Sequence, residues 1–451
     1  MYLPGGRLAR VPESGTPRGP ALSEGFVKTS NRLLGLLGLA LVAPAAHAGG
    51  VYLWEIGTAT MGTAGAGWAA MPEEPFTAFT NPAGTVWRKE TEILAAGQLL
   101  YGDLGFDRGP QTNVSGGDGG NPVGWIPNAG FHAAGLLAEN VGWGFSAAGN
   151  FGGLLEYDSR WAGRRFAQTS DLLGLNLVPS LSWRVTPELS FGLALNVMWG
   201  FYEFKSAPRA GLTGGNAFLK YEDTDTGFGG NLGVIYRPSP GTTLGLVYTS
   251  KVALDFSDRL KLRNFGPLFN ELVGRLDGAR TEIDMNVPAT VTASLQQKLS
   301  PATTLYANLN WQDWSDFGKV GLEIGNPAQA SATVNRLYEN TWHAALGVRH
   351  RYERGALAGW SLSTGIAYDS SAVDEEDLTA DFVVGKQWRL GLGARRELCP
   401  GAVMDLGFTL VWTGDLDIDQ RGIGQLNPPR LQGTYENTAL YVFGGSVTWD
   451  L

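Results

Sequence analysis

Sulfur and histidine are scarce in this chain. The 451 residues include one cysteine, Cys399, and four histidines. A lone cysteine excludes an internal disulfide and any metal site built from several cysteines. His47 and His350 fall in an expected leader and turn, and His132 and His343 fall on expected strands, where a hydrogen-bonded wall histidine is the simpler interpretation. Because Gly-x-Ser-x-Gly, His-Glu-x-x-His and phosphate-loop motifs are also absent, we expect neither an enzyme, such as a barrel lipase or protease, nor a cofactor or metal site.

Long apolar runs are also lacking. The one helix-like run, Leu33–Val42, is too short to cross a bilayer, which takes about 20 residues. It follows Lys28 and Arg32 and precedes Ala46-His47-Ala48. A basic region, an apolar region and an A-x-A site in this order are typical of a secretory signal. We therefore expect residues 1–48 to be a leader that is cleaved after Ala48.

Basic charge is low and glycine is abundant. The formal net charge is -9, and this acidity argues against nucleic acid as a partner. Glycine accounts for 64 of the 451 residues, about twice its usual share of roughly 7%. The chain also has 15 Trp, yet its mean hydropathy is only -0.07. This composition suits strands with one lipid-facing and one lumen-facing side, with a soluble all-β protein as the alternative.

Many segments alternate between large apolar and small or polar residues. In Leu189–Phe201 every odd position is large and apolar, and nearly every even position is small or polar. The same pattern recurs in Leu305–Gln312 and Ala439–Trp449. Side chains alternate across a strand, so each such strand has one apolar face. The recurring pattern predicts a transmembrane β-barrel.

Connections of two lengths alternate along the chain. Six short turns rich in Pro and Gly, such as Thr186–Glu188, alternate with seven longer polar connections. This predicts about fourteen antiparallel strands, with short turns on one side of the membrane and long loops on the other. A soluble sandwich would not show that asymmetry. The expected long connections are Asp107–Gly124, Leu155–Ser170, Lys205–Leu219, Ser257–Arg280, Lys319–Asn340, Ser370–Gly385 and Thr413–Tyr435.

The segment before the first strand does not alternate. Residues 49–89 are rich in small residues, whereas alternating segments fill residues 90–451. A barrel of fourteen strands closes on itself and leaves a lumen. We therefore expect an N-terminal hatch, residues 49–89, inside a barrel, residues 90–451. An open porin would leave residues 49–89 without a role. An adhesin or phage receptor would use the loops, and such a role is compatible with transport. Hatch residues that could line a ligand path or simply pack are Trp54, Met61, Trp68, Met71, Phe76 and Phe79.

Three blocks of sequence resemble one known family. The first block contains Tyr52-x-x-Glu55, the Met61–Gly67 stretch and Asn81-Pro82-Ala83. The second runs from Asn150-Phe151-Gly152 to Leu181, and the third is Gln387–Gly393. Together they resemble the outer-membrane long-chain fatty acid transporters of the FadL type, which include aromatic-hydrocarbon uptake proteins.

The resemblance implies a mechanism. Outer loops would capture a hydrophobic ligand, the hatch would rearrange, and the ligand would leave sideways through a kink in the third strand. Asn150, Phe151, Gly152 and Gly153 would form that kink, and Asn81-Pro82-Ala83 would sit against it as part of the gate. Glycine suits a broken ladder, and Pro82 stiffens the hatch turn. Glu55 would either bond within the hatch or bind an arginine of the barrel wall.

The resemblance leaves the ligand open. In relatives a basic pair meets the fatty acid carboxylate; Lys205 and Arg209 lie in the right segment for one member, but Glu339 is acidic where the other would stand. Long-chain fatty acids lead as the expected ligand, with uncharged aromatic or aliphatic hydrocarbons as the alternative. The implied surroundings are the lipid and lipopolysaccharide of the bacterial outer membrane and the barrel-assembly machinery, and we expect a monomer.

Overall fold

The computed structural model describes most of the chain. The described residues are 51–207, 217–264, 277–278, 280–317, 319–322, 332–335, 337–422 and 428–451. The expected leader and Arg209 lie outside them. No helix within the described ranges is long and apolar enough to cross a membrane.

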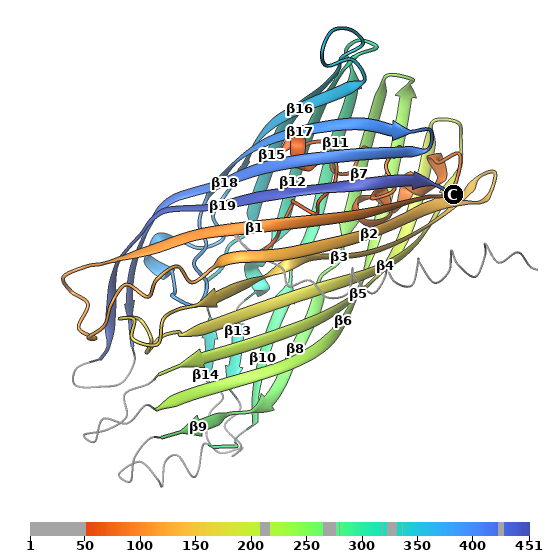
Figure 1. The fold of residues 1–451 in the computed structure, drawn as a ribbon. Helices are drawn as coiled ribbons and strands as arrows, with labels where there is room; N and C mark the ends of the chain where they lie inside the picture. Colours follow the sequence, from red (N-terminus) through yellow and green to blue (C-terminus); the bar gives the residue numbers. More distant parts are fainter. Residues whose placement is uncertain are drawn as a thin grey trace, which may run out of the picture.

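Fourteen of the described strands form one closed antiparallel barrel (Figure 1), as the alternating turns and loops predict. Each strand pairs with its neighbours along the chain, the last strand pairs with the first, and pairing of β5 with β6 completes the ring. The strands of the ring are β1 (Glu92–Arg108), β2 (Gly124–Ala138), β3 (Val141–Glu156), β4 (Thr169–Arg184), β5 (Leu189–Ser206), β6 (Phe218–Ser239), β7 (Thr242–Thr249), β11 (Ala289–Lys298), β12 (Thr303–Asp313), β15 (Thr341–Arg351), β16 (Trp360–Asp369), β17 (Gln387–Cys399), β18 (Ala402–Arg421) and β19 (Arg430–Asp450).

The large apolar residues of the strands face outward. In β5, Phe191, Leu193, Leu195 and Trp199 are 45–61% exposed, whereas Ser190, on the opposite face of the strand, is buried. Apolar side chains that stay exposed all around a protein are expected to face lipid rather than water. The alternation in the sequence therefore marks the lipid-facing side of the wall, as predicted.

Several strands continue beyond this apolar band on the long-loop side. β8 (Val252–Arg259) pairs with β10 (Arg280–Val287), β13 (Lys319–Leu322) pairs with β14 (Ala332–Asn335), and β9 (Lys261–Arg263) pairs with β6. In barrels of this kind the long loops lie outside the cell, so these extensions project outward.

The expected connection Thr413–Tyr435 is wrong. β18 continues to Arg421 and β19 starts at Arg430, and the two strands stay paired across this region after register shifts near Gly414. The alternation continues there, but polar side chains such as Asp417 now point outward and apolar side chains such as Ile418 are buried. Beyond the lipid, an outward carboxylate meets water, so a polar run does not end the strand.

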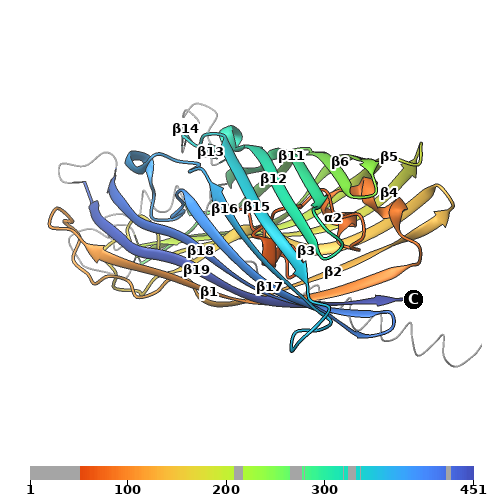
Figure 2. The same ribbon diagram turned by 90° about the horizontal axis from the view of Figure 1, so that it is seen from above.

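Residues 51–89 lie inside the barrel (Figure 2); we call them the inner segment. Most of them are buried. The segment contains three short helices, η1 (Met61–Thr63), α2 (Thr77–Thr80) and η2 (Pro82–Trp87). Asn81 caps η2 by accepting a hydrogen bond from the Ala83 backbone N–H, and Pro82 fits the first helical position because its missing N–H would be unpaired there anyway. η1 packs against β15–β18, and η2 packs against β2–β6.

Candidate functional site

The barrel wall is interrupted between β2 and β3. β3 pairs with β2 only as far as Ala148, whereas the first part of β2, from Gly124, pairs with β1 alone. On its other side, β3 changes register against β4 between Gly149 and Phe151. At Gly152, φ is +136°, and a Cβ atom would stand 2.0 Å from the Leu172 carbonyl oxygen. Only glycine fits this backbone, and the interruption coincides with the expected kink residues.

The start of the inner segment occupies the interruption. The Leu53 backbone N–H donates to the Asn150 carbonyl at 2.8 Å, and the Gly152 N–H donates to the Val51 carbonyl at 2.8 Å. Tyr52 pairs with Phe151 as an antiparallel bridge between these bonds. The segment therefore acts as a short substitute strand along the edge of β3 that β2 leaves free.

The Asn81-Pro82-Ala83 motif does not sit against the kink, contrary to the expectation from the resemblance. The Asn81 amide donates to the Val234 carbonyl of β6 at 3.1 Å and to the Ala69 carbonyl at 2.9 Å. The Ala83 carbonyl accepts a hydrogen bond of 2.7 Å from the Ser190 hydroxyl of β5. The motif fits here because the wall has glycines under it, Gly192 and Gly233, at which a Cβ would stand about 2 Å from its atoms.

Glu55 binds an arginine of the barrel wall, the second of the two arrangements considered from the sequence. Both of its carboxylate oxygens accept hydrogen bonds from Arg389 Nη1 of β17, at 2.8 and 2.6 Å. Arg389 Nε also donates to Asp369 of β16 at 2.6 Å, and Asp369 bonds His343 Nδ1 of β15 at 2.8 Å. The ring of His343 stacks on Trp54 with 4.0 Å between centroids. Both side chains of the Glu55–Arg389 pair are at most 2% exposed.

A second charged anchor joins the middle of the inner segment to the wall. Glu74 is 2% exposed and pairs with Arg395 of β17, with Arg349 of β15 at 3.9 Å. Burial alone would raise the pKa of the Glu74 carboxyl, but the two arginines outweigh burial and hold its pKa below the ordinary value. The inner segment is thus fixed by two buried ion pairs as well as by packing.

A cavity that we call the lumen pocket lies between the inner segment and the wall, beside the kink. Its volume is ≈ 40 Å³, room for a few water molecules with the inner segment in this position. One side carries aromatic rings of the inner segment, Tyr52, Trp68 and Phe79, and the other side carries amides and hydroxyls of the strands. Among the described residues that line it, none is charged. The wall side includes Asn150, Asn176, Asn196, Asn231, Thr249, Ser250, Thr290 and Thr292.

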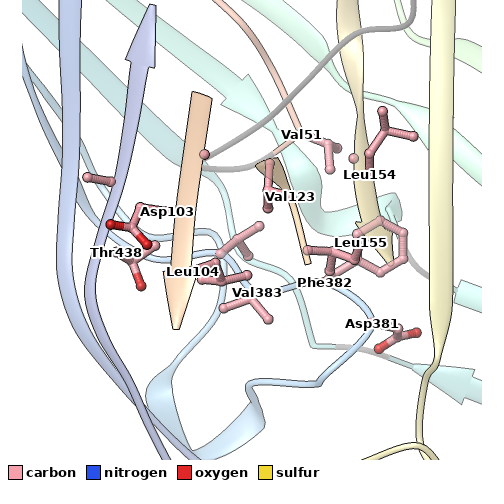
Figure 3. A pocket seen from close by; sticks show the side chains of 14 residues that line it. Val51, Asp103, Leu104, Val123, Leu154, Leu155, Asp381, Phe382, Val383 and Thr438 are labelled. Atoms are coloured by element: carbon pink, nitrogen blue, oxygen red, sulfur yellow. The ribbon is translucent and has the colours of Figure 1, made fainter. Parts of the chain in front are cut away.

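A second cavity, the wall pocket, lies at the interruption itself (Figure 3), with a volume of ≈ 40 Å³. Apolar side chains from β1, β3 and the connection between β16 and β17 meet there, including Leu104, Leu155 and Phe382. Its charged lining residues are Asp103 and Asp381. This pocket therefore has an apolar surface with negative rather than positive charge at its edge.

The expected ligand-contacting residues occupy three kinds of position. Trp68 and Phe79 line the lumen pocket. Met61 and Phe76 are at most 1% exposed and pack elsewhere, as Trp54 does on His343. Lys205 lies near the outer end of β5, where its ammonium is 5.8 Å from the Phe218 ring centroid. None of these three packing residues, nor Lys205, lines either of the two pockets.

Sequence reasoning missed the wall residues that complete the site. It cited Arg389 only within a matching block, and it interpreted His343 as a hydrogen-bonded wall histidine without identifying Asp369 as its partner. The usable signal was polarity on an inward strand position: Asn176 and Asn196 each stand where the alternation points a side chain into the lumen.

A closed barrel filled by an inner segment, with an interruption in its wall beside a partly apolar cavity, defines a transport barrel of the outer membrane. The chain belongs to the family described as outer membrane protein transport protein (OMPP1/FadL/TodX), whose profile matches residues 39–450. Its relatives are therefore transport proteins of the outer membrane.

Individual relatives agree with this assignment. A protein of Escherichia coli named long-chain fatty acid transport protein is 24% identical, over 90% of this chain and 93% of its own. Outer membrane protein P1 of Haemophilus influenzae is 25% identical, over 85% of this chain and 90% of its own. Among solved structures, a FadL homologue of Pseudomonas aeruginosa matches with a TM-score of 0.78 at 20% identity, covering 89% of this chain and 99% of its own. The toluene transporter TbuX of Ralstonia pickettii matches with a TM-score of 0.63 at 18% identity, covering 88% and 99%.

Proposed function

We propose that this protein carries hydrophobic small molecules into the outer membrane, without chemical conversion of the ligand. The observation that carries the proposal is the lumen pocket, a partly aromatic cavity directly beside the interruption between β2 and β3. Long-chain fatty acids and toluene, the ligands in the names of relatives, are both hydrophobic. Burial of each CH₂ group contributes about 0.8 kcal/mol, so an apolar path alone suffices to take up such molecules from water.

In this proposal the inner segment is the hatch, corresponding to residues 49–89, of a barrel formed by residues 90–451. The ligand would move from the outer loops to the lumen pocket and leave sideways at Asn150–Gly153. Because Val51, Tyr52 and Leu53 occupy the free edge of β3, release requires that they move. Glu55 and Asn81 would hold the remainder of the segment against the wall during this motion.

The charge of the two pockets favours an uncharged ligand. No basic residue is found among the described residues lining either pocket, and two carboxylates line the wall pocket. An isolated carboxylate loses several kcal/mol when it leaves water without a partner. The fatty acid remains the second candidate, because Lys205 could meet a carboxylate near the outer end of β5 before the ligand enters.

A binding series on the purified protein tests both candidates. The ligands are a long-chain fatty acid, its methyl ester and an alkane of equal length, each titrated into wild type and Lys205→Gln. Equal binding of ester and alkane, with weaker binding of the acid, supports uncharged ligands. Tighter binding of the acid, lost in Lys205→Gln, supports the fatty acid. If none of the three binds, the transport proposal is wrong and an open porin or an adhesin becomes the better explanation.

A matched pair of variants locates the site. Trp68→Ala removes a ring that lines the lumen pocket, whereas Trp388→Ala removes a ring that is 47% exposed on the outer face of β17. We expect ligand affinity to fall about tenfold or more in the first variant, because a buried aromatic contact is lost, and to stay unchanged in the second. Equal effects in both variants would contradict a ligand site in the lumen pocket.

A further inference from the structure

The lumen pocket contains amide groups without partners. The side chains of Asn176, Asn196 and Asn231 are 2%, 7% and 5% exposed. Within the part of the chain that the structure describes, the Oδ1 atom of each has no hydrogen-bond partner. All three residues line the lumen pocket and come from three consecutive strands, β4, β5 and β6.

Such unpaired amides are costly unless something in the cavity binds them. Leaving a buried donor or acceptor unsatisfied costs about 1–3 kcal/mol, and buried polar groups in folded proteins nearly always have a partner. Asn150, on β3, shows the contrast, because its Oδ1 accepts a hydrogen bond of 2.8 Å from Asn176 Nδ2. The three free oxygens therefore face a space in which a water molecule or a ligand group completes their bonding.

The opposite side of the same cavity suits hydrocarbon. The ring of Trp68 meets that of Phe79 edge-on with 6.4 Å between centroids, and the Trp68 ring also meets that of Trp54 at 5.1 Å. Trp68 and Phe79 belong to the inner segment and line the pocket. The cavity thus has one aromatic side and one side on which amides and hydroxyls stand among apolar residues such as Val178 and Met198, with no charge among its described lining residues.

We infer that the lumen pocket selects uncharged hydrophobic molecules that carry a hydroxyl group, such as long-chain or aromatic alcohols, over hydrocarbons and carboxylates. This inference rests on the proposed function and names its ligand class. A hydroxyl donates one hydrogen bond and accepts others, so it satisfies an amide in either orientation, whereas an alkane satisfies neither. A carboxylate offers only acceptors, and the free Oδ1 atoms need donors.

The experiment compares 1-decanol, 1-methoxydecane, decane and decanoate on the purified full-length protein by calorimetric titration in one detergent. The variants are Asn196→Leu and Asn231→Leu, singly and together, because leucine keeps the branching and the number of side-chain heavy atoms of asparagine without its polar atoms. Asn308→Leu is the matched control: Asn308 is buried in the lumen with an unpartnered Nδ2 and does not line the pocket. Ligand loss to micelles is the same for every variant, so it cancels when one ligand is compared between variants; comparisons between ligands use affinities corrected for the partition of each ligand into micelles.

We expect wild type to bind decanol about three- to tenfold more tightly than the ether, as one additional hydrogen bond predicts. The double variant removes two of the three free oxygens, so this preference should fall there, while decane binds equally or more tightly; in Asn308→Leu it should persist. Equal binding of decanol and ether by wild type, or an undiminished preference in the double variant, would overturn the inference but leave transport intact. Decanoate binding more tightly than decanol would also overturn it. Failure of all four ligands to bind would instead contradict the proposed function.

Discussion

Replacement of Arg389 by leucine should release the inner segment from the wall. Arg389 is 1% exposed, and its guanidinium binds the Glu55 carboxylate through Nη1 and Asp369 through Nε. Removing the guanidinium leaves the buried carboxylates of Glu55 and Asp369 without their cation. Breaking a buried ion pair in this way costs about 3–5 kcal/mol. Such a cost raises the population of the undocked segment by a factor of about one hundred to several thousand.

Hydrogen exchange of the purified protein measures this population. In the docked state the Leu53 amide is bonded to the Asn150 carbonyl, so its exchange rate reports opening of the segment. We expect exchange in residues 51–60 to accelerate by at least two powers of ten in Arg389→Leu, while the strands of the barrel remain protected. Arg351→Leu is the matched control, because Arg351 also lies on a wall strand but is exposed.

A compensating variant separates charge from packing. In Glu55→Leu/Arg389→Leu the unpaired carboxylate of the segment is gone, and Asp369 retains its bond to His343. Exchange should therefore return part of the way toward wild type. The reasoning fails if Arg389→Leu exchanges as slowly as Arg351→Leu, or if the double variant opens more than the single one.

Three further predictions concern other parts of the inner segment and the wall. Gly152→Val places a Cβ where only glycine fits and should reduce ligand uptake severalfold. Gly97→Val is the control, because a Cβ there meets nothing within 4 Å and uptake should stay unchanged. Similar uptake by both variants would refute a role for the kink. Asn81→Ala removes a helix cap and two bonds to backbone carbonyls, so we expect docking to weaken by about 1–2 kcal/mol, detected as faster exchange of the segment. The folded-state pKa of Glu74 lies below its ordinary value, so the stabilisation from Arg395 is present at pH above that ordinary value and is lost as pH falls through the folded-state pKa. Tryptophan fluorescence should therefore report loosening of the inner segment on acidification. Glu74→Gln should abolish this pH dependence.

The barrel could be predicted from the sequence because its rule is local. A strand in lipid must put apolar groups on every second position, and residues such as Leu193 and Trp199 meet that requirement without reference to any other strand. The same rule failed where the lipid ends, since Asp417 and Ile418 continue β18 with their faces exchanged.

The site was only partly predictable because its contacts are long-range. The Glu55–Arg389 pair joins residues 334 positions apart, and no local pattern specifies which wall arginine meets which carboxylate. The placement of Asn81-Pro82-Ala83 was wrong for a similar reason: the glycines that admit it, Gly192 and Gly233, lie opposite each other on β5 and β6 and become neighbours only when these strands pair.

Residues 51–53 pair with the edge of β3 that β2 leaves free, and this pairing affects when the inner segment can move. Backbone groups at the edge of β3 that lose this partner face a medium in which lipid cannot replace the hydrogen bond. The Asn150 carbonyl and the Gly152 N–H, both bonded to the inner segment, would be left unpaired the moment it moves. If the segment moves as proposed, these two groups stay hydrogen-bonded only when water or a polar ligand group takes its place. A polar group of the ligand would then compete with the inner segment for the Asn150 carbonyl and the Gly152 N–H.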